Sequence, residues 1–416
     1  LNNKLHVIDG NRKIQIFDVD IPKPVLTLNS SDGGSCSKIG TWSSSSKTCT
    51  LSTNLTDQII IASDGIILDG NGKSITGGYS NAVGMGDSTF REGVKLDGRT
   101  GVTVKNFMIN NVGMGISLTS SENNWIEGNT FSDIGGGMEL KNSPTNTITS
   151  NTINARDATG IKVENSNANI ITNNVISGAS PAILVSGSNL LTIDGNSFKN
   201  NASGMYVIRG GQIAITHNVF EFDGQGWWTT TNGNAIQMDG AGWHTIAFNT
   251  ISGAYNEGIR VSADAMNIHN NIISDTKIGI NILYSGGDGQ CSGTEAFHVW
   301  KNTISVPSSG DMTHGILAKN NSEKICYDEN TITGPDSGDA RLLSLDGDKN
   351  SIVKNNQMSG GNYGLSVVNS EGTAITDNTA NNNSQYGFHV DSLSDLTTFT
   401  GNTATGNTVG DFEGIS

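Results

Sequence analysis

The hydrophobic positions of this chain form short alternating runs and do not follow helical spacing. Each run begins with glycine, followed by an apolar residue, a residue that is usually polar, and a second apolar residue. Examples are GVKL at 93–96, GIKV at 160–163 and GIRV at 258–261. Alternation with a period of two predicts a short β-strand with one buried face. Because no stretch has the i, i+3, i+4, i+7 spacing of an amphipathic helix, we predict an all-β protein.

A second phrase, built around an asparagine, recurs between these runs. Its form is seen in ITSNTI at 148–153 and IAFNTI at 246–251, where apolar residues flank the asparagine on both sides. Successive asparagines are 22 residues apart or somewhat more, with steps of up to 31 where extra residues are inserted. A repeat with a fixed minimum length is typical of stacked coils that carry loop insertions.

Each repeat therefore holds two or three short strands, and glycine and asparagine supply the positive φ of the corners between them. A single repeat cannot bury its apolar face, whereas stacked repeats join like strands into parallel sheets around one core. We predict a right-handed parallel β-helix, a solenoid of about 13 coils. We also expect the repeated asparagines to stack in a hydrogen-bonded structural ladder, which includes Asn129, Asn151, Asn174, Asn196, Asn218, Asn249 and Asn271.

The repeat resembles the parallel β-helix repeat of the pectin-lyase-like superfamily, especially its NosD-like members and secreted archaeal and bacterial surface proteins. The resemblance extends from about residue 60 to about residue 410. It includes LDGNGKSI at 68–75, which is similar to the opening of the helix in such proteins. If the chain is an enzyme, its resemblance to the enzymes of this superfamily implies an active site on one sheet face, with loops of neighbouring coils as its walls. The catalytic motifs of polygalacturonases and alginate epimerases are absent as sets, so the resemblance implies the fold and not the activity.

The pattern divides the chain into two parts, an N-terminal strand, hairpin and cap segment at 1–55 and the β-helix at 56–416. Residues 5–17 predict a hairpin, because Asp9-Gly10 is a strong turn signal between two alternating runs. We expect this hairpin either to cap its own chain or to pair with another subunit by strand addition. Residues 406–416 lack an amphipathic capping helix, and this predicts end-to-end association of the rod with itself.

Charge excludes two classes of partner. The net charge of −15 argues against nucleic acid, which requires clustered Lys and Arg, and against an anionic membrane surface. No run approaches 18 apolar residues, so we expect no membrane insertion. The chain begins with Leu1 in place of Met, which is typical of a processed protein whose signal peptide has been removed.

The four cysteines lie in two sequence neighbourhoods and form no Cys-x-x-Cys pair, so zinc ligation is not expected. We predict the disulfides Cys36–Cys49 and Cys291–Cys326, although four cysteines allow three pairings. Disulfides indicate an extracellular or cell-surface location. No metal site or cofactor is expected with certainty; Ca²⁺ is left open, because turns such as SGGDGQ at 285–290 are rich in oxygen ligands.

Candidate chemistry gathers between residues 204 and 262. If the polar residue of each run points outward, Tyr206, Gln237 and Arg260 lie on neighbouring strands of one sheet face. Asp239 is the next outward residue after Gln237, and Arg209 follows the run of Tyr206. We therefore predict Tyr206, Arg209, Asp239 and Arg260 as catalytic candidates if the protein is an enzyme.

Three tryptophans, Trp227, Trp228 and Trp243, lie in or beside the insertion in this region. A tryptophan ring beside a polar residue such as Gln237 provides a flat apolar face with a hydrogen-bonding rim, which a sugar ring requires. We therefore predict that these four residues contact carbohydrate.

Three functions remain open at this stage: a structural or adhesive protein, a polysaccharide-active enzyme, and a carbohydrate-binding module without catalysis. Whether the protein is an enzyme is therefore open as well. The favoured one is a structural or adhesive protein of the cell surface, a self-associating filament or surface-layer subunit with a carbohydrate-contacting face. Its partners would be its own copies, polysaccharide, or both. The alternative is a polysaccharide-active enzyme with a cleft near 204–262. In a uronate lyase or C5-epimerase, Arg209 or Arg260 would neutralise the carboxylate, and Tyr206 or Lys162 would act as base. In a glycoside hydrolase, Asp239 would be one of two carboxylates.

Overall fold

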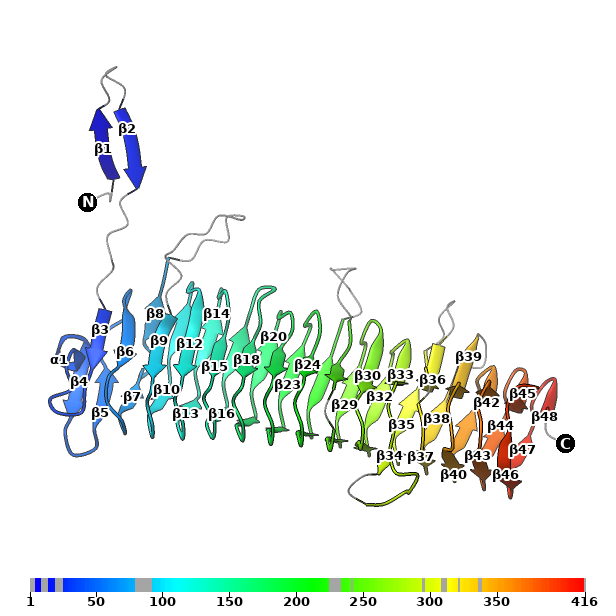
Figure 1. Ribbon diagram of the computed structural model, residues 1–416. Helices are drawn as coiled ribbons and strands as arrows, with labels where there is room; N and C mark the ends of the chain where they lie inside the picture. The colour runs from blue at the N-terminus through cyan, green and yellow to red at the C-terminus, as the bar shows by residue number, and fades with distance from the viewer. Residues whose placement is uncertain are drawn as a thin grey trace.

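The computed structural model shows that the chain winds into a right-handed parallel β-solenoid of about 14 turns (Figure 1). This confirms the fold that the repeat predicts. The structure describes residues 4–8, 14–18, 25–78, 92–223, 233–240, 242–293, 296–307, 313–320, 322–335 and 339–414.

One turn of the solenoid visits three sheets, as the path from β9 (Glu92–Asp97) through β10 (Thr103–Lys105) to β11 (Met108–Asn110) shows. We call the sheets that contain β9, β10 and β11 the first, second and third sheet. Over the described residues they hold 16, 16 and 14 strands respectively. The first runs from β3 (Val25–Leu28) to β48 (Gly410–Glu413), the second from β4 (Gly40–Ser43) to β46 (Leu396–Thr400), and the third from β8 (Ser74–Thr76) to β47 (Thr403–Thr405).

The core is a continuous stack of the apolar residues that the alternation predicts to point inward. Ile148 and Ile153, on either side of one asparagine, are both fully buried. The glycine that opens each run stands where the chain turns from the third sheet into the first. A β-carbon at Gly137 would collide with the carbonyl oxygen of Gly160 in the next turn and press on Ile153. Glycine is therefore needed there because neighbouring turns leave no space for a side chain.

The asparagine ladder runs through the interior corner between the second and third sheets. Asn151 shows the pattern: its backbone N–H and Nδ2 both donate to Oδ1 of Asn174, at 2.9 and 3.0 Å, and its own Oδ1 accepts the same two bonds from Asn129. The same bonds recur without a break through Asn196, Asn218, Asn249, Asn271, Asn302, Asn330, Asn356, Asn378 and Asn402. The marker residue of the repeat therefore has an architectural role.

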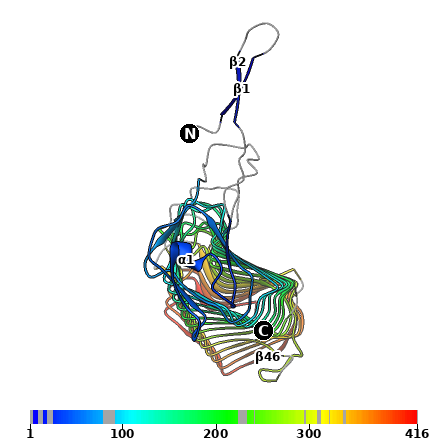
Figure 2. The same cartoon turned by 90° about the vertical axis from the view of Figure 1, so that its left-hand side faces the viewer.

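The N-terminal part supplies the first strands of two sheets. β3 pairs in parallel with β6 (Gln58–Ile61), and β5 (Thr48–Leu51) pairs with β7 (Ile67–Asp69), so the sheets begin before residue 56. The antiparallel pair β4–β5 and the short helix α1 (Cys36–Ile39) lie at this end of the rod, joined by the disulfide Cys36–Cys49. Figure 2, a view along the axis, shows α1 across the end of the superimposed coils.

The hairpin expected at 5–17 is present as β1 (Lys4–Ile8) paired antiparallel with β2 (Ile14–Asp18). Whether it serves its own chain or a second subunit stays a prediction.

The second disulfide, Cys291–Cys326, ties an insertion in the chain to the second sheet. Cys291 lies in the connection between β33 (Ile278–Leu283) and β34 (Phe297–Trp300), and Cys326 lies in β37 (Ile325–Asp328). Both predicted pairings are thus present. Among the described residues, no helix is long and apolar enough to span a membrane.

Candidate functional site

The outward column that the alternation predicts is found on the first sheet. On β24 (Met205–Ile208), β27 (Ile236–Asp239), β30 (Glu257–Ser262) and β33, the parallel register places Tyr206, Gln237, Arg260 and Asn281 side by side. The residues on either side of Gln237, Ile236 and Met238, are fully buried in the core. The side chains of the column therefore project from the outer side of the sheet.

A chain of hydrogen bonds joins the first part of this column. Asn234 Nδ2 donates to Gln237 Oε1 at 3.2 Å, and Gln237 Nε2 donates to Asp239 Oδ2 at 2.8 Å. Partial burial and a hydrogen bond to Asp239 raise the pKa of Tyr206 above its ordinary value. Tyr206 therefore keeps its proton at neutral pH and donates a hydrogen bond to the Asp239 carboxylate. A phenol held in this way is a hydrogen-bond donor and not a ready base.

The second part of the site is built around Glu257, which is only 8% exposed although it lies on the outer side of the first sheet. Its carboxylate accepts a short hydrogen bond from Asn281 Nδ2 and lies 3.9 Å from Nη1 of Arg260. We call the set formed by both parts the central cluster: Tyr206, Asn234, Gln237, Asp239, Glu257, Arg260 and Asn281.

The central cluster contains polar atoms that are buried and have no hydrogen-bond partner. These atoms are Oδ1 of Asn234, Oε2 of Glu257, Nε of Arg260 and Oδ1 of Asn281. A buried polar atom without a partner costs about 1–3 kcal/mol, and folded proteins contain few of them. Four such atoms on three consecutive turns of one face indicate a place where a ligand supplies the missing partners.

On another part of the outer face of the first sheet, the charged side chains all have partners. Lys162, in the same column as Arg260, forms ion pairs with Glu139 at 3.0 Å and with Glu164 at 2.9 Å. The ammonium group of Lys162 also donates hydrogen bonds to Glu164 and Glu139. These bonds raise the pKa of Lys162 above its ordinary value, and the bond to Glu164 has the larger effect. The alternating charges of this region therefore neutralise one another, as surface ion pairs do, and they provide an internal comparison for the central cluster.

A cavity of about 600 Å³ adjoins the central cluster at the corner between the third and first sheets. Its lining includes Tyr255 and Asn256, which directly precede Glu257, together with Asp275 and Lys277 of the next turn. Tyr255 is 60% exposed, so its ring is available to a ligand. The cavity thus places an accessible aromatic side chain next to the unsatisfied polar atoms.

The other predicted site residues lie farther from the central cluster. Arg209 is exposed at the corner after β24, with φ +54°. Trp243, 52% exposed, occupies the equivalent corner after β27. Both corners lead from the first sheet to the second, whereas the cavity lies at the opposite edge of the first sheet. Trp227 and Trp228 lie outside the described residues.

Glu257, Asn234 and Asn281 were not among the site residues predicted from the sequence. A signal for Glu257 was available, since the phrase EGIRVS at 257–262 repeats the form of EGVKLD at 92–97. Glu92 occupies the same position in its turn and also accepts a hydrogen bond from the following turn, from Ser117 Oγ at 3.2 Å. A glutamate directly before the glycine of a run is therefore drawn onto the outer face by a donor on the next strand.

A row of aromatic rings lies on the second sheet, away from the central cluster. His217, Phe248, His269 and Trp300 follow one another with ring centroids 5.1, 5.3 and 4.6 Å apart. The first and last of these contacts are parallel stacks, so the ring faces lie largely against one another. The middle contact is edge-to-face, at 84°, so the row is not one continuous stack.

Among the described residues, potential metal ligands gather at one place on the second sheet. Within the part of the chain that the structure describes, one group of three potential ligand atoms lies within 4.8 Å of one another: His298, Cys326 and Asp328. The sulfur of Cys326 is bonded to Cys291, so this group is not a free ligand set.

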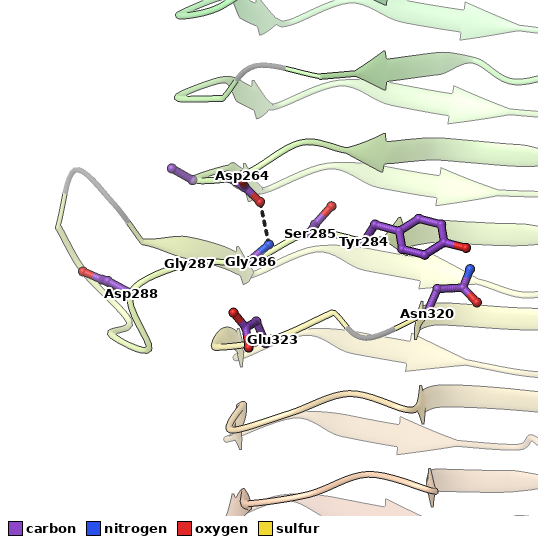
Figure 3. Close-up of a pocket in the computed structure, with 9 residues that line it drawn as sticks. Asp264, Tyr284, Ser285, Gly286, Gly287, Asp288, Asn320 and Glu323 are labelled. Atoms are coloured by element: carbon purple, nitrogen blue, oxygen red, sulfur yellow. Dashed lines mark hydrogen bonds between the residues drawn. The ribbon is translucent and has the colours of Figure 1, made fainter.

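The turn 285–290, where Ca²⁺ was left open, borders a second cavity of about 410 Å³ lined by Asp264, Tyr284, Asp288, Asn320 and Glu323 (Figure 3). In Figure 3 the carboxylate of Asp264 is directed at the backbone N–H of Gly286, which it accepts at 2.8 Å, while Asp288 lies apart from it. The carboxylates do not converge on one point.

Two family models match the chain. The model of the right-handed β-helix region matches residues 171–313 and 292–415, more than half of the chain. The chain belongs to the right-handed β-helix family. The model of the periplasmic copper-binding protein NosD matches residues 40–232 of this β-helix protein. No curated protein matches its sequence.

Several solved structures are similar to this β-helix protein at low identity. DFA-IIIase from Arthrobacter chlorophenolicus A6, in complex with GF2, is 13% identical with a TM-score of 0.48 over 68% of this chain and 70% of that chain. PfbA, a surface adhesin of Streptococcus pneumoniae, is 13% identical with a TM-score of 0.46 over 82% and 83%. The tailspike protein of E. coli bacteriophage HK620, in complex with a pentasaccharide, is 10% identical with a TM-score of 0.30 over 87% and 69%. These values support no conclusion about activity.

Proposed function

We propose that this protein is a polysaccharide-binding rod that works outside the cytosol, and that the central cluster is its binding face. The observation that carries the proposal is the set of buried, unpartnered polar atoms of Asn234, Glu257, Arg260 and Asn281 on three consecutive turns. Nothing comparable is needed for folding, because the ion pairs of Lys162 show that the same sheet face can be fully saturated.

The chemistry of these atoms favours a ligand rich in hydroxyl groups. The Asn and Glu oxygens are acceptors, and Nε of Arg260 is a donor. A bare cation would need only acceptors and an anion only donors, whereas a hydroxyl group both donates and accepts. Tyr255 adds an exposed aromatic face beside them, on which the apolar side of a sugar ring can stack.

Two observations support a location outside the cytosol. Both pairs of cysteines form disulfides, which persist in oxidising compartments. The match to a periplasmic family over residues 40–232 fits the same compartment class, that of secreted or surface proteins. Self-association into filaments or a surface layer remains a prediction, and it is compatible with a glycan-binding face on the side of the rod.

Arg260→Ala is expected to weaken polysaccharide binding at least tenfold, because it removes a hydrogen-bond donor and an ion pair from the binding face. The measurement is the dissociation constant from affinity electrophoresis or calorimetry with a panel of neutral and acidic polysaccharides. Lys162→Ala is the matched control, since Lys162 is also a cation of this outward column with acidic neighbours. Equal binding by the two variants, or no binding by the wild type across the panel, would refute the proposal.

Catalysis is the second candidate, favoured by one specific observation. The central cluster contains two carboxylates, Asp239 and Glu257, and glycoside hydrolysis requires a pair. If the protein is a hydrolase, the bound polysaccharide acquires new reducing ends on incubation. Asp239→Asn and Glu257→Gln are then expected to abolish the release of reducing ends while binding persists. A wild-type protein that binds polysaccharide without cleaving it would exclude this candidate and leave the binding proposal intact.

A further inference from the structure

The unsatisfied outer face of the first sheet continues beyond the central cluster. The next three turns contribute β36 (Thr313–Lys319), β39 (Ala340–Asp346) and β42 (Tyr363–Val368). Each carries one more buried polar atom without a partner: Nδ1 of His314, Nε of Arg341 and Oγ of Ser366. Together with Asn234, Glu257, Arg260 and Asn281, every one of six consecutive turns holds at least one such atom on this face.

The register shows that these residues form a straight line along the rod. Glu257 pairs with Ile278, which pairs with His314, which pairs in turn with Arg341, Tyr363 and Tyr386. Ser366 lies in the column of Arg260 and Asn281. Apart from Asn234, which precedes β27, the residues with unsatisfied atoms therefore occupy two columns that run parallel to the axis.

Aromatic side chains close the far end of this line. The Arg341 guanidinium lies over the ring of Tyr363, 5.5 Å from its centroid, and the Tyr363 and Tyr386 rings lie 6.2 Å apart at an angle of 19°. Tyr386 belongs to β45 (Tyr386–Val390), and its ring lies against Gly410 of β48, where a β-carbon would be 3.2 Å from it. Because Gly410 has no side chain, its strand leaves room for this ring. We call His314, Arg341, Tyr363, Ser366 and Tyr386 the distal cluster.

The positive charge of the distal cluster, on Arg341, is not neutralised by an ion pair with a described residue. Among the residues that the structure describes, Arg341 has no acidic side chain within ion-pair distance. Burial, with the positive charges of Arg341 and Lys319, lowers the pKa of His314 to about 4, against a smaller opposing effect of Asp339. His314 is therefore an uncharged imidazole at neutral pH and can donate or accept a hydrogen bond. The distal cluster thus combines donors and acceptors, as the central cluster does.

We infer that the central and distal clusters form one continuous binding track, and that its ligand is an extended polysaccharide chain lying parallel to the rod axis. This inference rests on the proposed function and specifies the ligand as a long chain rather than a small sugar. From β27 to β45 the track crosses six strand spacings, a length of ~29 Å. With a sugar residue of about one strand spacing, the full track accommodates about six residues.

The test is a glycan array of oligosaccharides two to ten residues long, in cello-oligosaccharide and oligogalacturonide series. We expect affinity to rise with length up to about six residues and then level off. Tyr386→Ala is expected to weaken binding of the long oligosaccharides at least tenfold and to leave the shortest bound ones unchanged. Tyr363→Ala serves as a second variant with the same expectation. Tyr284→Ala removes a 68% exposed tyrosine that lies outside the track and is the control.

The outcomes separate the two proposals. Affinity that levels off at two or three residues while remaining sensitive to Arg260→Ala would overturn the continuous track and leave the proposed function standing. The same holds if both tyrosine variants fold, as circular dichroism can verify, and bind long oligosaccharides like the wild type. Absence of binding in every series and to every polysaccharide would overturn both.

Discussion

Asn174→Ala is expected to lower the free energy of unfolding by about 4 kcal/mol, the sum of several buried groups that lose their partners at about 1–3 kcal/mol each. Asn174 Nδ2 donates to the Ile148 carbonyl oxygen at 2.9 Å, and its Oδ1 accepts from the backbone N–H and Nδ2 of Asn151. Alanine removes these hydrogen bonds and leaves the backbone N–H of Asn151 without its acceptor, whereas Asn151 Nδ2 still donates to the carbonyl oxygens of Ile126 and Thr149. The measurement is the unfolding midpoint and slope in guanidinium chloride.

Asn154→Ala is the matched control, because Asn154 ends β17 (Thr152–Asn154) close to the ladder but its side chain is exposed. We expect this variant to change stability by less than about 0.5 kcal/mol. A loss below about 1 kcal/mol for Asn174→Ala would contradict the ladder as a main source of stability. Solenoids can unfold in parts, so the comparison uses the first transition of each variant.

The second large effect concerns pH, and it arises from Asp348. This residue is fully buried at the corner after β39; its Oδ2 accepts a hydrogen bond from the Tyr327 hydroxyl at 3.3 Å, and its Oδ1 has no partner. Burial raises the pKa of Asp348 to about 7, assisted by the charge of Glu323 and opposed by hydrogen bonds from Ser351 and Tyr327.

Because this pKa is higher in the folded state than in the unfolded chain, the native protein holds a proton that the unfolded chain releases above about pH 4. The stabilisation is therefore fully present below pH 4, falls as the pH rises, and is lost once the pH exceeds about 7. A shift of about three pKa units corresponds to about 4 kcal/mol. We expect Asp348→Asn to remove this part of the pH dependence, measured as unfolding midpoints between pH 4 and pH 8.

Asp346→Asn provides the comparison, since Asp346 is two residues away but exposed. This variant is expected to follow the wild-type pH profile. If wild type and Asp348→Asn lost stability in parallel as the pH rose, the buried carboxyl would not be the group responsible.

The fold was predictable because each of its determinants repeats locally in the sequence. The alternation around residues such as Val94 and Val163 marks the inward positions, and a single asparagine per turn marks the ladder. Since the repeat length varies only by insertions, counting positions from the glycine of each run also yields the correct strand register. Tyr206, Gln237 and Arg260 are neighbours in the structure for this reason.

The candidate site was predictable only in part, because burial and missing partners are properties of several turns together. Gln237, Asp239 and Arg260 could be placed from the alternation, but Glu257 precedes the run and has no place in that pattern. Whether Glu257 and Arg341 are satisfied depends on side chains one turn away, among them Asn281 and Tyr363. Such neighbours differ from turn to turn, so no periodic signal reports them.

Two of the long connections in the chain, residues 77–91 and 222–235, lead from the third sheet into the first. The strands around the second of these keep their pairing, with Val207 opposite Met238, as though the extra residues were absent. Connections at this corner can thus differ in length without changing the pairing of the strands on either side. Natural variants or designed hybrids could acquire a new binding specificity by exchanging these connections, because a change in the connection does not affect how the coils assemble.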